Sequence, residues 1–429
     1  MDDMSIQLML LLFVVLLFAG LPVGFTIGIT SLLAILVMEL DVSLISQRVF
    51  VGLDSFPMMA LPMFILAGNL MSGGGITDRL WNFAKKSLGF IRGASGFVSV
   101  VTSMLFAAMS GSALATVGGL GKLQIDGMVE DGFKTEEASA ITAAASTIGP
   151  IIPPSIVFVL YGVLAGVSIG RLFMAGVIPG ILMGFSIMVY IAIRVNRSKQ
   201  QYIKRPKCSL SELFSAFIKA IPPLMTPIII LGGILAGMFT PTEAAAVSSA
   251  YALGLGIIYR EITPRSLYHI LLDTAKTSAS IMLIIGFANG FSWLLTIMGA
   301  SEVFYDFITS FGDSKITVLI LVNIALLIVG CFIETNSAVI LLTPVLTPAL
   351  IAFGLDPVHI GIILSVNLLI GILTPPMGMA LYVVQRIGGA PFNKIVHAVL
   401  PLIFYLVIVQ VLVTFIPALS LMLPKLVMG

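Results

Sequence analysis

Charged side chains are scarce in this sequence. Only 10% of its 429 residues are Asp, Glu, Lys or Arg, whereas 59% are hydrophobic. Soluble domains carry about a quarter charged residues, so this composition cannot supply a water-facing surface and excludes a soluble globular protein. The apolar runs, such as residues 8–19, are long rather than alternating, which excludes a transmembrane β-barrel. We therefore expect an all-α polytopic membrane protein with about ten spans.

Cysteine and histidine are also rare. The two cysteines, Cys208 and Cys331, stand far apart, and the three histidines are scattered. This excludes a disulfide framework and a Cys/His metal site. The sequence contains no H-E-x-x-H motif and no Walker loop. We expect neither enzymatic activity nor ATP-driven transport by this chain alone.

The chain opens on the acidic run Met1-Asp2-Asp3-Met4, without a basic segment before the first apolar stretch. A secretory signal peptide has such a basic segment and a small-residue cleavage site. We therefore expect the first helix to stay in the membrane with its start outside the cell.

Ten spans follow from the apolar segments, and two further segments differ from them. The segments 93–129 and 314–353 each hold a small, polar cluster at their middle, Ser110-Gly111-Ser112-Ala113 and Glu334-Thr335-Asn336-Ser337. Non-helical backbone is tolerated at membrane depth only where protein or a cavity surrounds it. We predict two re-entrant hairpins at these segments. The expected spans are 5–20, 22–38, 57–73, 134–166, 171–195, 221–238, 242–260, 278–298, 357–388 and 396–420.

The placement of basic residues supports the hairpins. With both hairpins returning to their own side, 18 of the 22 Lys and Arg residues fall on one side, which the positive-inside rule makes cytoplasmic. The remaining four are Arg48, Arg171, Lys315 and Lys425. The most basic connection, 194–207, is interpreted as a loop beside anionic lipid rather than a ligand site. The segments 76–92 and 261–276 mix charged with apolar residues, which predicts interfacial amphipathic helices.

The two halves, 1–210 and 211–429, repeat one order of elements. Ile148-Gly149-Pro150-Ile151-Ile152-Pro153-Pro154 returns in the second half as Ile370-Gly371-Ile372-Leu373-Thr374-Pro375-Pro376, and Ser112 of the first tip is paired with Ser337 of the second. In the predicted topology the halves have opposite orientations. Proline interrupts a helix, so 134–166 and 357–388 are expected to be broken helices. Paired breaks in inverted halves indicate the binding sites of a secondary transporter.

Oxygen-bearing residues gather at the predicted tips and breaks. The candidate ion ligands are Ser110, Ser112, Gly149 and Ser155 in the first half and Thr335, Asn336, Ser337 and Thr374 in the second. Such hard, uncharged oxygen ligands suit Na⁺, and helix N-termini at the same tips suit an anionic substrate.

Two glutamates close to these segments have different expected roles. Glu334 is either a functional carboxylate or an acceptor that holds its tip together. Glu243, which follows Thr240-Pro241-Thr242, is expected to cap a helix start.

These residues resemble the large membrane subunit of the tripartite ATP-independent periplasmic (TRAP) transporters, and the resemblance covers essentially the whole chain. It rests on Met109-Ser110-Gly111-Ser112-Ala113, on 148–155, on Phe239-Thr240-Pro241-Thr242-Glu243-Ala244 and on Leu373-Thr374-Pro375-Pro376. One departure is that Leu114 stands where family members often carry Asp. We therefore place no acidic ion ligand in that tip.

The resemblance implies a complex with a small four-helix membrane subunit and a periplasmic substrate-binding protein in the bacterial inner membrane. It implies Na⁺-driven import of an organic acid by an elevator motion, with 76–92 and 261–276 as arms. It further implies two Na⁺ sites with the substrate between them. The first Na⁺ site would comprise Ser110, Gly111, Ser112, Gly149, Pro153 and Ser155, and the second Thr335, Asn336, Ser337, Gly371, Thr374 and Pro375. The substrate would contact Ser110, Ser112, Pro154, Asn336 and Pro376.

Within the family, the likeness is closest to the sialic-acid-type systems, ahead of those for C4-dicarboxylates. The alternatives that stay open are a stand-alone cation- or proton-coupled carrier of organic anions and, from another class, a membrane enzyme or a channel.

Overall fold

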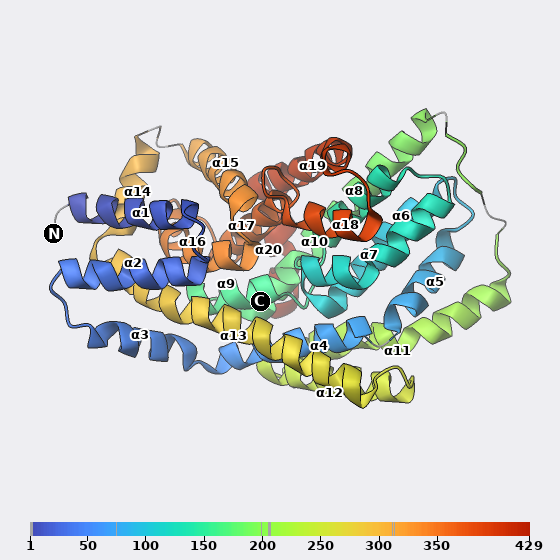
Figure 1. Cartoon of the computed structure of the whole chain (residues 1–429), viewed down its shortest axis with the longest axis horizontal. Helices are drawn as coiled ribbons and strands as arrows, with labels where there is room; N and C mark the ends of the chain where they lie inside the picture. Colours follow the sequence, from blue (N-terminus) through green and yellow to red (C-terminus); the bar gives the residue numbers. More distant parts are fainter. Residues whose placement is uncertain (1–2, 74, 199, 205–206, 311, 313) are drawn as a thin grey trace.

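The computed structural model describes residues 3–73, 75–198, 200–204, 207–310, 312 and 314–429. Its regular elements, within those ranges, are helices (Figure 1). In the first half these are α1 (Asp3–Phe18), α2 (Val23–Val37), α3 (Ser43–Leu53), η1 (Phe56–Met59), α4 (Ala60–Gly73), α5 (Ile76–Leu88), α6 (Ala94–Ser110), α7 (Ala113–Glu130), α8 (Thr135–Ser146), α9 (Ile156–Ala165) and α10 (Ile169–Arg197). In the second half they are α11 (Leu210–Leu235), α12 (Pro241–Ile258), α13 (Pro264–Ile297), α14 (Ala300–Thr309), α15 (Lys315–Phe332), α16 (Thr335–Ala352), α17 (Pro357–Gly371), α18 (Met379–Gly388), α19 (Phe392–Phe415) and α20 (Ala418–Met428).

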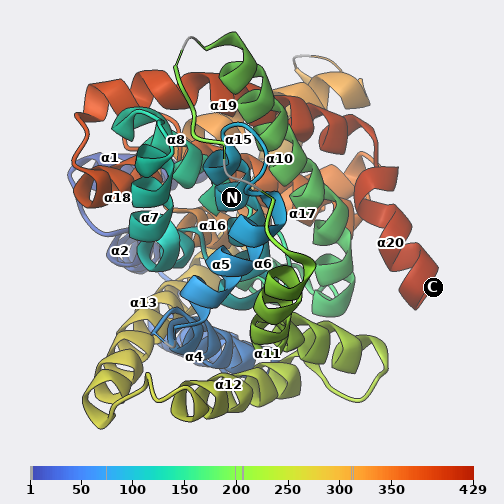
Figure 2. The ribbon, with the colours of Figure 1, turned by 90° about the vertical axis from the view of Figure 1, so that its right-hand side faces the viewer.

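The helices form two regions, and two long helices of one region contact the other. The helices α4, α11, α12 and α13 lie along the lower side in Figures 1 and 2, and α13 packs against α2, α3 and α4. The other region contains α6 to α10 and α15 to α20, with α10 packed against α6, α17, α19 and α20. Helices α4 and α13 reach from the first region to the second, contacting α6 and α16 respectively.

The predicted hairpins and broken helices are present. Helices α6 and α7 meet at Gly111-Ser112, and α15 and α16 meet at Ile333-Glu334. The segment 147–155 separates α8 from α9, and 372–378 separates α17 from α18. Among the described residues, six helices are long and apolar enough to cross a membrane, and a seventh span results if α3 and the helix after it, bent by 64°, count as one. Broken spans escape this criterion because each half is short.

Several predicted boundaries differ from the structure. The interfacial segment 261–276 and the span 278–298 form one continuous helix, α13, because Asp273–Ser280 contains neither Gly nor Pro. Helices α3, α14 and α20 were not expected, and the final span ends at Phe415 because Pro417 follows. The capping role predicted for Glu243 is confirmed, since its carboxylate accepts a hydrogen bond from the Thr240 amide at 2.8 Å. The predictions that rest on Met1, Asp2, Lys199 and Arg205 lie outside the described residues.

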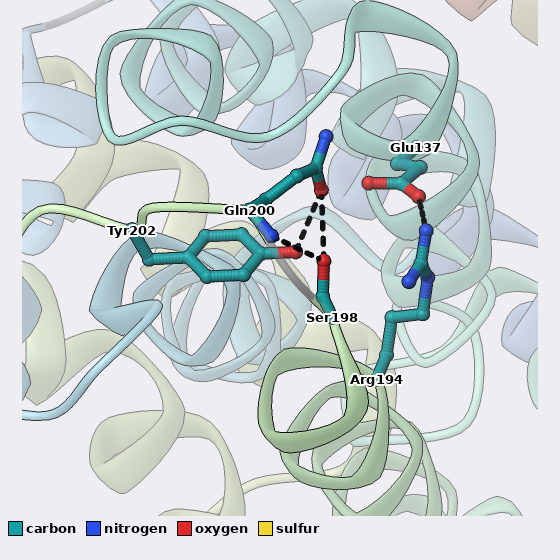
Figure 3. A network of polar contacts seen from close by, with 5 residues as sticks. All are labelled: Glu137, Arg194, Ser198, Gln200 and Tyr202. Atoms are coloured by element: carbon teal, nitrogen blue, oxygen red, sulfur yellow. Dashed lines mark hydrogen bonds and ion pairs between the residues drawn. The ribbon is translucent and has the colours of Figure 1, made fainter.

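Polar contacts fix the open end of the first hairpin (Figure 3). Arg194 of α10 forms an ion pair with Glu137 in the first turn of α8, and the hydroxyl of Tyr202 donates to Gln200 Oε1 at 3.0 Å. The ring of Tyr202 packs against Phe133, with 4.8 Å between centroids, in the turn between α7 and α8. The basic connection therefore folds back onto the hairpin and holds α8 against α10.

The second hairpin contacts its broken helix through two glycines. A Cβ atom at Gly371 would stand 2.5 Å from the Cα atom of Gly330, a distance that real Cβ contacts do not reach. Gly330 lies in the last turn of α15 and Gly371 ends α17. The absence of side chains here lets the two backbones approach at the point where α17 breaks.

The variant Gly371→Ala is expected to lose about 1–3 kcal/mol of stability because its methyl group pushes α15 from α17. The measurement is the thermal midpoint of the detergent-purified protein, followed by size-exclusion chromatography. Gly254→Ala in α12 is the matched control, because a Cβ atom there meets nothing within 4 Å, and helical Ala is preferred to Gly. Equal midpoints for the two variants would contradict the close contact.

Candidate functional site

The first hairpin tip is a short non-helical link held by its own polar groups. Gly111 has a φ of +59°, a left-handed conformation that favours glycine. Ser112 caps α7, and its hydroxyl accepts from the Ala115 amide at 3.4 Å. Ser110 is buried, and its hydroxyl lies 3.0 Å from that of Thr116. The predicted ligands Ser110 and Ser112 therefore lie together, but with different partners.

Oxygen atoms crowd around Gly149 in the first broken helix. A Cβ atom there would stand 2.9 Å from Thr116 Oγ1, 3.0 Å from the Ser146 carbonyl oxygen and 3.2 Å from the Ser112 carbonyl oxygen. Only glycine allows the hairpin and the break to approach so closely. Thr116 is the residue that the sequence interpretation missed, although its position four residues after Ser112 on a helix places both on one face. The three atoms nearest to this point are all oxygens, which are the ligands that suit Na⁺.

The first break is joined directly to the first tip. The Ile156 amide donates to the Gly111 carbonyl oxygen at 3.4 Å, and a Cβ atom at Gly111 would stand 2.7 Å from the Pro154 carbonyl oxygen. Ser155 caps α9, accepting from the Phe158 amide at 3.1 Å, and its hydroxyl donates to the Pro150 carbonyl oxygen. The Pro153–Pro154 bond is cis, as is Pro375–Pro376. The predicted grouping of 110–112 with 149–155 is thus present in space.

The second tip is organised by Glu334. Its Oε1 accepts from the Asn336 side-chain amide at 2.8 Å, and its Oε2 accepts from the backbone amide of Ser337 at 3.1 Å and from its hydroxyl at 3.4 Å. The buried Thr335 hydroxyl, by contrast, has no hydrogen-bond partner. Of the two roles left open for Glu334, the structure shows the tip-holding one.

The second break has its own local hydrogen bonds. The Thr374 amide donates to the Gly371 carbonyl oxygen at 2.8 Å, and the Thr374 hydroxyl donates to the Ile370 carbonyl oxygen at 3.1 Å. Pro376 is exposed whereas Pro154 is buried. Both breaks therefore contain a cis Pro–Pro bond, but they differ in the exposure of its second proline.

The pairing of Ser112 with Ser337 is wrong. Helix α7 spans 113–130 and α16 spans 335–352, so both ends are displaced along the chain by the same offset that relates the two Pro–Pro pairs. With this offset Ser112 corresponds to Glu334, and each caps its helix by accepting from the amide three residues on. The sequence pairing failed because it matched residue types and ignored the capping position, which only the backbone defines.

Both tips line one small cavity. Its lining includes Gly111, Ser112 and Pro150 from the first half and Glu334, Thr335 and Asn336 from the second. Its volume of about 20 Å³ accommodates roughly one water-sized occupant, since a water needs at least about 10–15 Å³. An organic acid enters this space only if the tips part.

Not every predicted site residue reaches this cavity. Gly111, Ser112, Thr335 and Asn336 line it. The other predicted residues surround it in the tips and the breaks without contributing to its lining: Ser110, Gly149, Pro153, Pro154, Ser155, Ser337, Gly371, Thr374, Pro375 and Pro376.

Three helix N-termini contribute to the lining of the cavity. The starts of α7, α9 and α16 all contribute lining residues, namely Ala113, Ile156 and Thr335. Each helix start carries a partial positive charge and free backbone amides, which attract anions. Glu334 contributes a carboxylate to this lining from one side.

Side-chain amides of α15, α17 and α19 form hydrogen bonds close to the second break. Asn323 Oδ1 in α15 accepts from Asn367 in α17 at 2.8 Å, from Gln410 in α19 at 2.6 Å and from Thr414 at 3.2 Å. Asn367 lies one turn before Gly371. The three helices are therefore tied together beside the point where α17 ends, through one shared oxygen atom.

Comparison with known proteins places this architecture in one family. The model of the "Tripartite ATP-independent periplasmic transporter, DctM component" matches residues 10–419. The chain is 44% identical over 418 residues to the sialic acid TRAP transporter large permease protein SiaM of Vibrio cholerae, covering 96% of this chain and 97% of that protein. It is 38% identical over 404 residues to the C4-dicarboxylate TRAP transporter large permease protein DctM of Pseudomonas aeruginosa, covering 93% and 94%.

A solved structure shares the fold. The YdaH transporter of Alcanivorax borkumensis superimposes with a TM-score of 0.62 over 87% of this chain and 88% of that one, at 13% sequence identity. At this identity the likeness concerns the fold alone.

The shared oxygen of Asn323 yields a stability prediction. Asn323→Leu is expected to destabilise the protein by about 1–3 kcal/mol, because three donors lose a buried acceptor. Asn393→Leu is the control, since Asn393 is exposed in the first turn of α19. The thermal midpoints of both variants are compared in detergent. If Asn323→Leu were no less stable than Asn393→Leu, Asn323 would not be the link between the three helices.

Proposed function

The chain belongs to the DctM component family of the tripartite ATP-independent periplasmic transporters, and on that premise we propose that it is the transport subunit of a Na⁺-coupled importer of a small organic acid. The single observation that carries the proposal is the meeting of both hairpin tips at one cavity among helix N-termini. Membrane helices broken near their middle give a carrier free backbone groups for ions and substrate. We place the protein in the bacterial inner membrane, with a small four-helix membrane subunit and a periplasmic substrate-binding protein as partners.

Two clusters of oxygen atoms are the proposed Na⁺ sites. In the first half, Thr116 joins Ser110, Ser112 and Gly149. In the second half, the partnerless Thr335 hydroxyl stands beside Asn336 and Ser337. Both sets offer hard oxygen atoms, which Na⁺ prefers.

Sialic acid is the favoured substrate over a C4-dicarboxylate. The support is the 44% identity to SiaM of Vibrio cholerae alone, since the sialic acid permease SiaT of Haemophilus influenzae, at 37%, is as distant as the C4-dicarboxylate permease, at 38%. Either substrate carries a carboxylate, which the helix starts at the cavity suit.

The proposed motion is an elevator, in which the hairpins and broken helices move against α4, α11, α12 and α13. The first arm, α5, starts beside the turn between α12 and α13, where Arg79 pairs with Glu261 at 3.1 Å and its guanidinium stacks 3.6 Å from the Tyr259 ring. The second arm is continuous with the fixed span in α13, so arm and span form one rigid rod. A hinge for this rod is then at its end, where Gly299 has a φ of +71°.

Uptake of a candidate organic acid into proteoliposomes tests the proposal. The chain is reconstituted with its small subunit and the cognate binding protein, and Na⁺ is replaced by K⁺ or choline. Uptake is expected to require both Na⁺ and the binding protein. Uptake indifferent to Na⁺ would overturn the coupling, and uptake by this chain alone would favour the stand-alone carrier.

Serine variants at the tips test the ion sites. Ser112→Ala and Ser337→Ala are each expected to raise the Na⁺ concentration for half-maximal uptake by about threefold to tenfold, because each loses a hydroxyl worth about 1 kcal/mol. Ser248→Ala in α12 is the control, since its hydroxyl bonds only the Ala245 carbonyl of its own helix. Unchanged Na⁺ activation in both tip variants would remove these ligands from the proposal.

A further inference from the structure

An apolar groove of about 620 Å³ lies between the end of α5 and the start of α11, away from the hairpin tips. Phe83 of α5 faces Phe217 of α11 across it, with 5.7 Å between their ring centroids. Leu210, Leu213 and Phe214 form the rest of the α11 wall. Leu210 is 86% exposed and Phe214 is 64% exposed, so the other described residues leave this apolar surface uncovered.

The groove lies within reach of lipid chains. Helix α11 is long and apolar enough to cross a membrane, and the end of α5 lies beside its start (Figure 1). The basic connection before α11 belongs to the side that the positive-inside rule makes cytoplasmic. The lining residues 210–217 extend about 10 Å along the helix, which is less than the roughly 15 Å of hydrocarbon in one leaflet. A lipid of the cytoplasmic leaflet therefore reaches the whole groove.

Basic side chains stand at the outer end of the groove. Lys86 is exposed and directly precedes Ser87, a lining residue of α5. Lys207 lies just before α11, and its ammonium nitrogen is 5.4 Å from the ring centroid of Phe90. The thiol of Cys208 donates to the Lys86 carbonyl oxygen at 3.1 Å. This contact holds the two basic segments together at one end of the groove.

Acidic residues are missing from both segments. Residues 83–92 and 203–211 contain Lys and Arg but neither Asp nor Glu. Glu212, which follows directly, does not line the groove, and its carboxylate accepts from the Ser209 amide at 3.4 Å. Within the described ranges, neither Lys86 nor Lys207 forms an ion pair. The positive charge at this end is therefore available to an anion from outside the chain.

We propose that the groove binds one anionic phospholipid of the cytoplasmic leaflet, with its phosphate at Lys86 and Lys207 and an acyl chain along Phe83, Phe214 and Phe217. Basic pockets between membrane helices on the cytoplasmic side suit anionic headgroups, and the apolar walls suit the chain. The lipid joins α5 to α11, so its binding holds the first arm against a helix of the other half. A zwitterionic lipid fills the groove but lacks the net negative charge, so it binds more weakly.

Native mass spectrometry of the full chain in detergent, titrated with phosphatidylglycerol or phosphatidylcholine, tests the headgroup contacts. The wild type is expected to bind phosphatidylglycerol with a Kd at least about tenfold below that for phosphatidylcholine. Lys86→Gln/Lys207→Gln is expected to lose this preference, because each lysine contributes to holding the phosphate. Lys122→Gln/Lys394→Gln is the matched control, since it removes two exposed lysines of the same predicted side from α7 and α19. It is expected to bind as the wild type does.

Phe214→Ser tests the apolar wall. Its Kd for phosphatidylglycerol is expected to rise about threefold to tenfold, because the acyl chain loses an aromatic contact. The rise in thermal midpoint that phosphatidylglycerol causes is expected to shrink with it. Phe404→Ser is the matched control, since Phe404 in α19 is 63% exposed, about as much as Phe214, and lies outside the groove. It is expected to keep both the Kd and the thermal response.

Three results would overturn the inference. Equal phosphatidylglycerol affinity of the wild type and Lys86→Gln/Lys207→Gln would remove the headgroup contacts. Equal losses in Phe214→Ser and Phe404→Ser would mean that lipid coats the protein without a specific site. Displacement of the lipid by added small membrane subunit, together with loss of that subunit from Phe214→Ser, would assign the groove to the protein partner. All these measurements are made without substrate or Na⁺, so their failure leaves the proposed function unaffected.

Discussion

The structure depends on one constraint, that backbone polar groups inside a bilayer must find partners within the protein. Among the described residues two helices are broken and two hairpins turn, and each of these four links leaves amides and carbonyls outside a helix. Backbone amides at three helix starts donate hydrogen bonds to the side chains of Ser112, Ser155 and Glu334. The Gly111 carbonyl oxygen accepts a hydrogen bond from the Ile156 amide. The sites proposed for ions and substrate are therefore the places where backbone groups outside the helices are bonded by nearby residues of the tips and breaks.

Glycine residues allow each hairpin to approach its broken helix closely. Gly149 brings the oxygen atoms of Thr116, Ser112 and Ser146 around one point, and Gly330 lets Gly371 approach without a side chain between them. In both halves the hairpin is thus pressed against its own broken helix. Close backbone contacts of this kind suit a body that moves as a unit, which the proposed elevator motion requires.

The inverted repeat supplies the framework, but its two halves are not chemically equivalent. Glu334 stands opposite Ser112, and Asn367 of the second half corresponds to Ala145 of the first. The amide cluster around Asn323 and the carboxylate at the tip thus both belong to the second half.

The sequence by itself determined the membrane class, the two hairpins, the Pro–Pro breaks and the family, because hydrophobic runs, proline and polar clusters act locally and leave a readable pattern. It also located most of the residues at the tips. Only the tertiary structure decided that Ser112 corresponds to Glu334, that Thr116 joins the first cluster and that 264–297 is one helix. These depend on capping position, on contacts between distant segments and on helix continuity, since the spacing of residue types does not record which atoms meet in space.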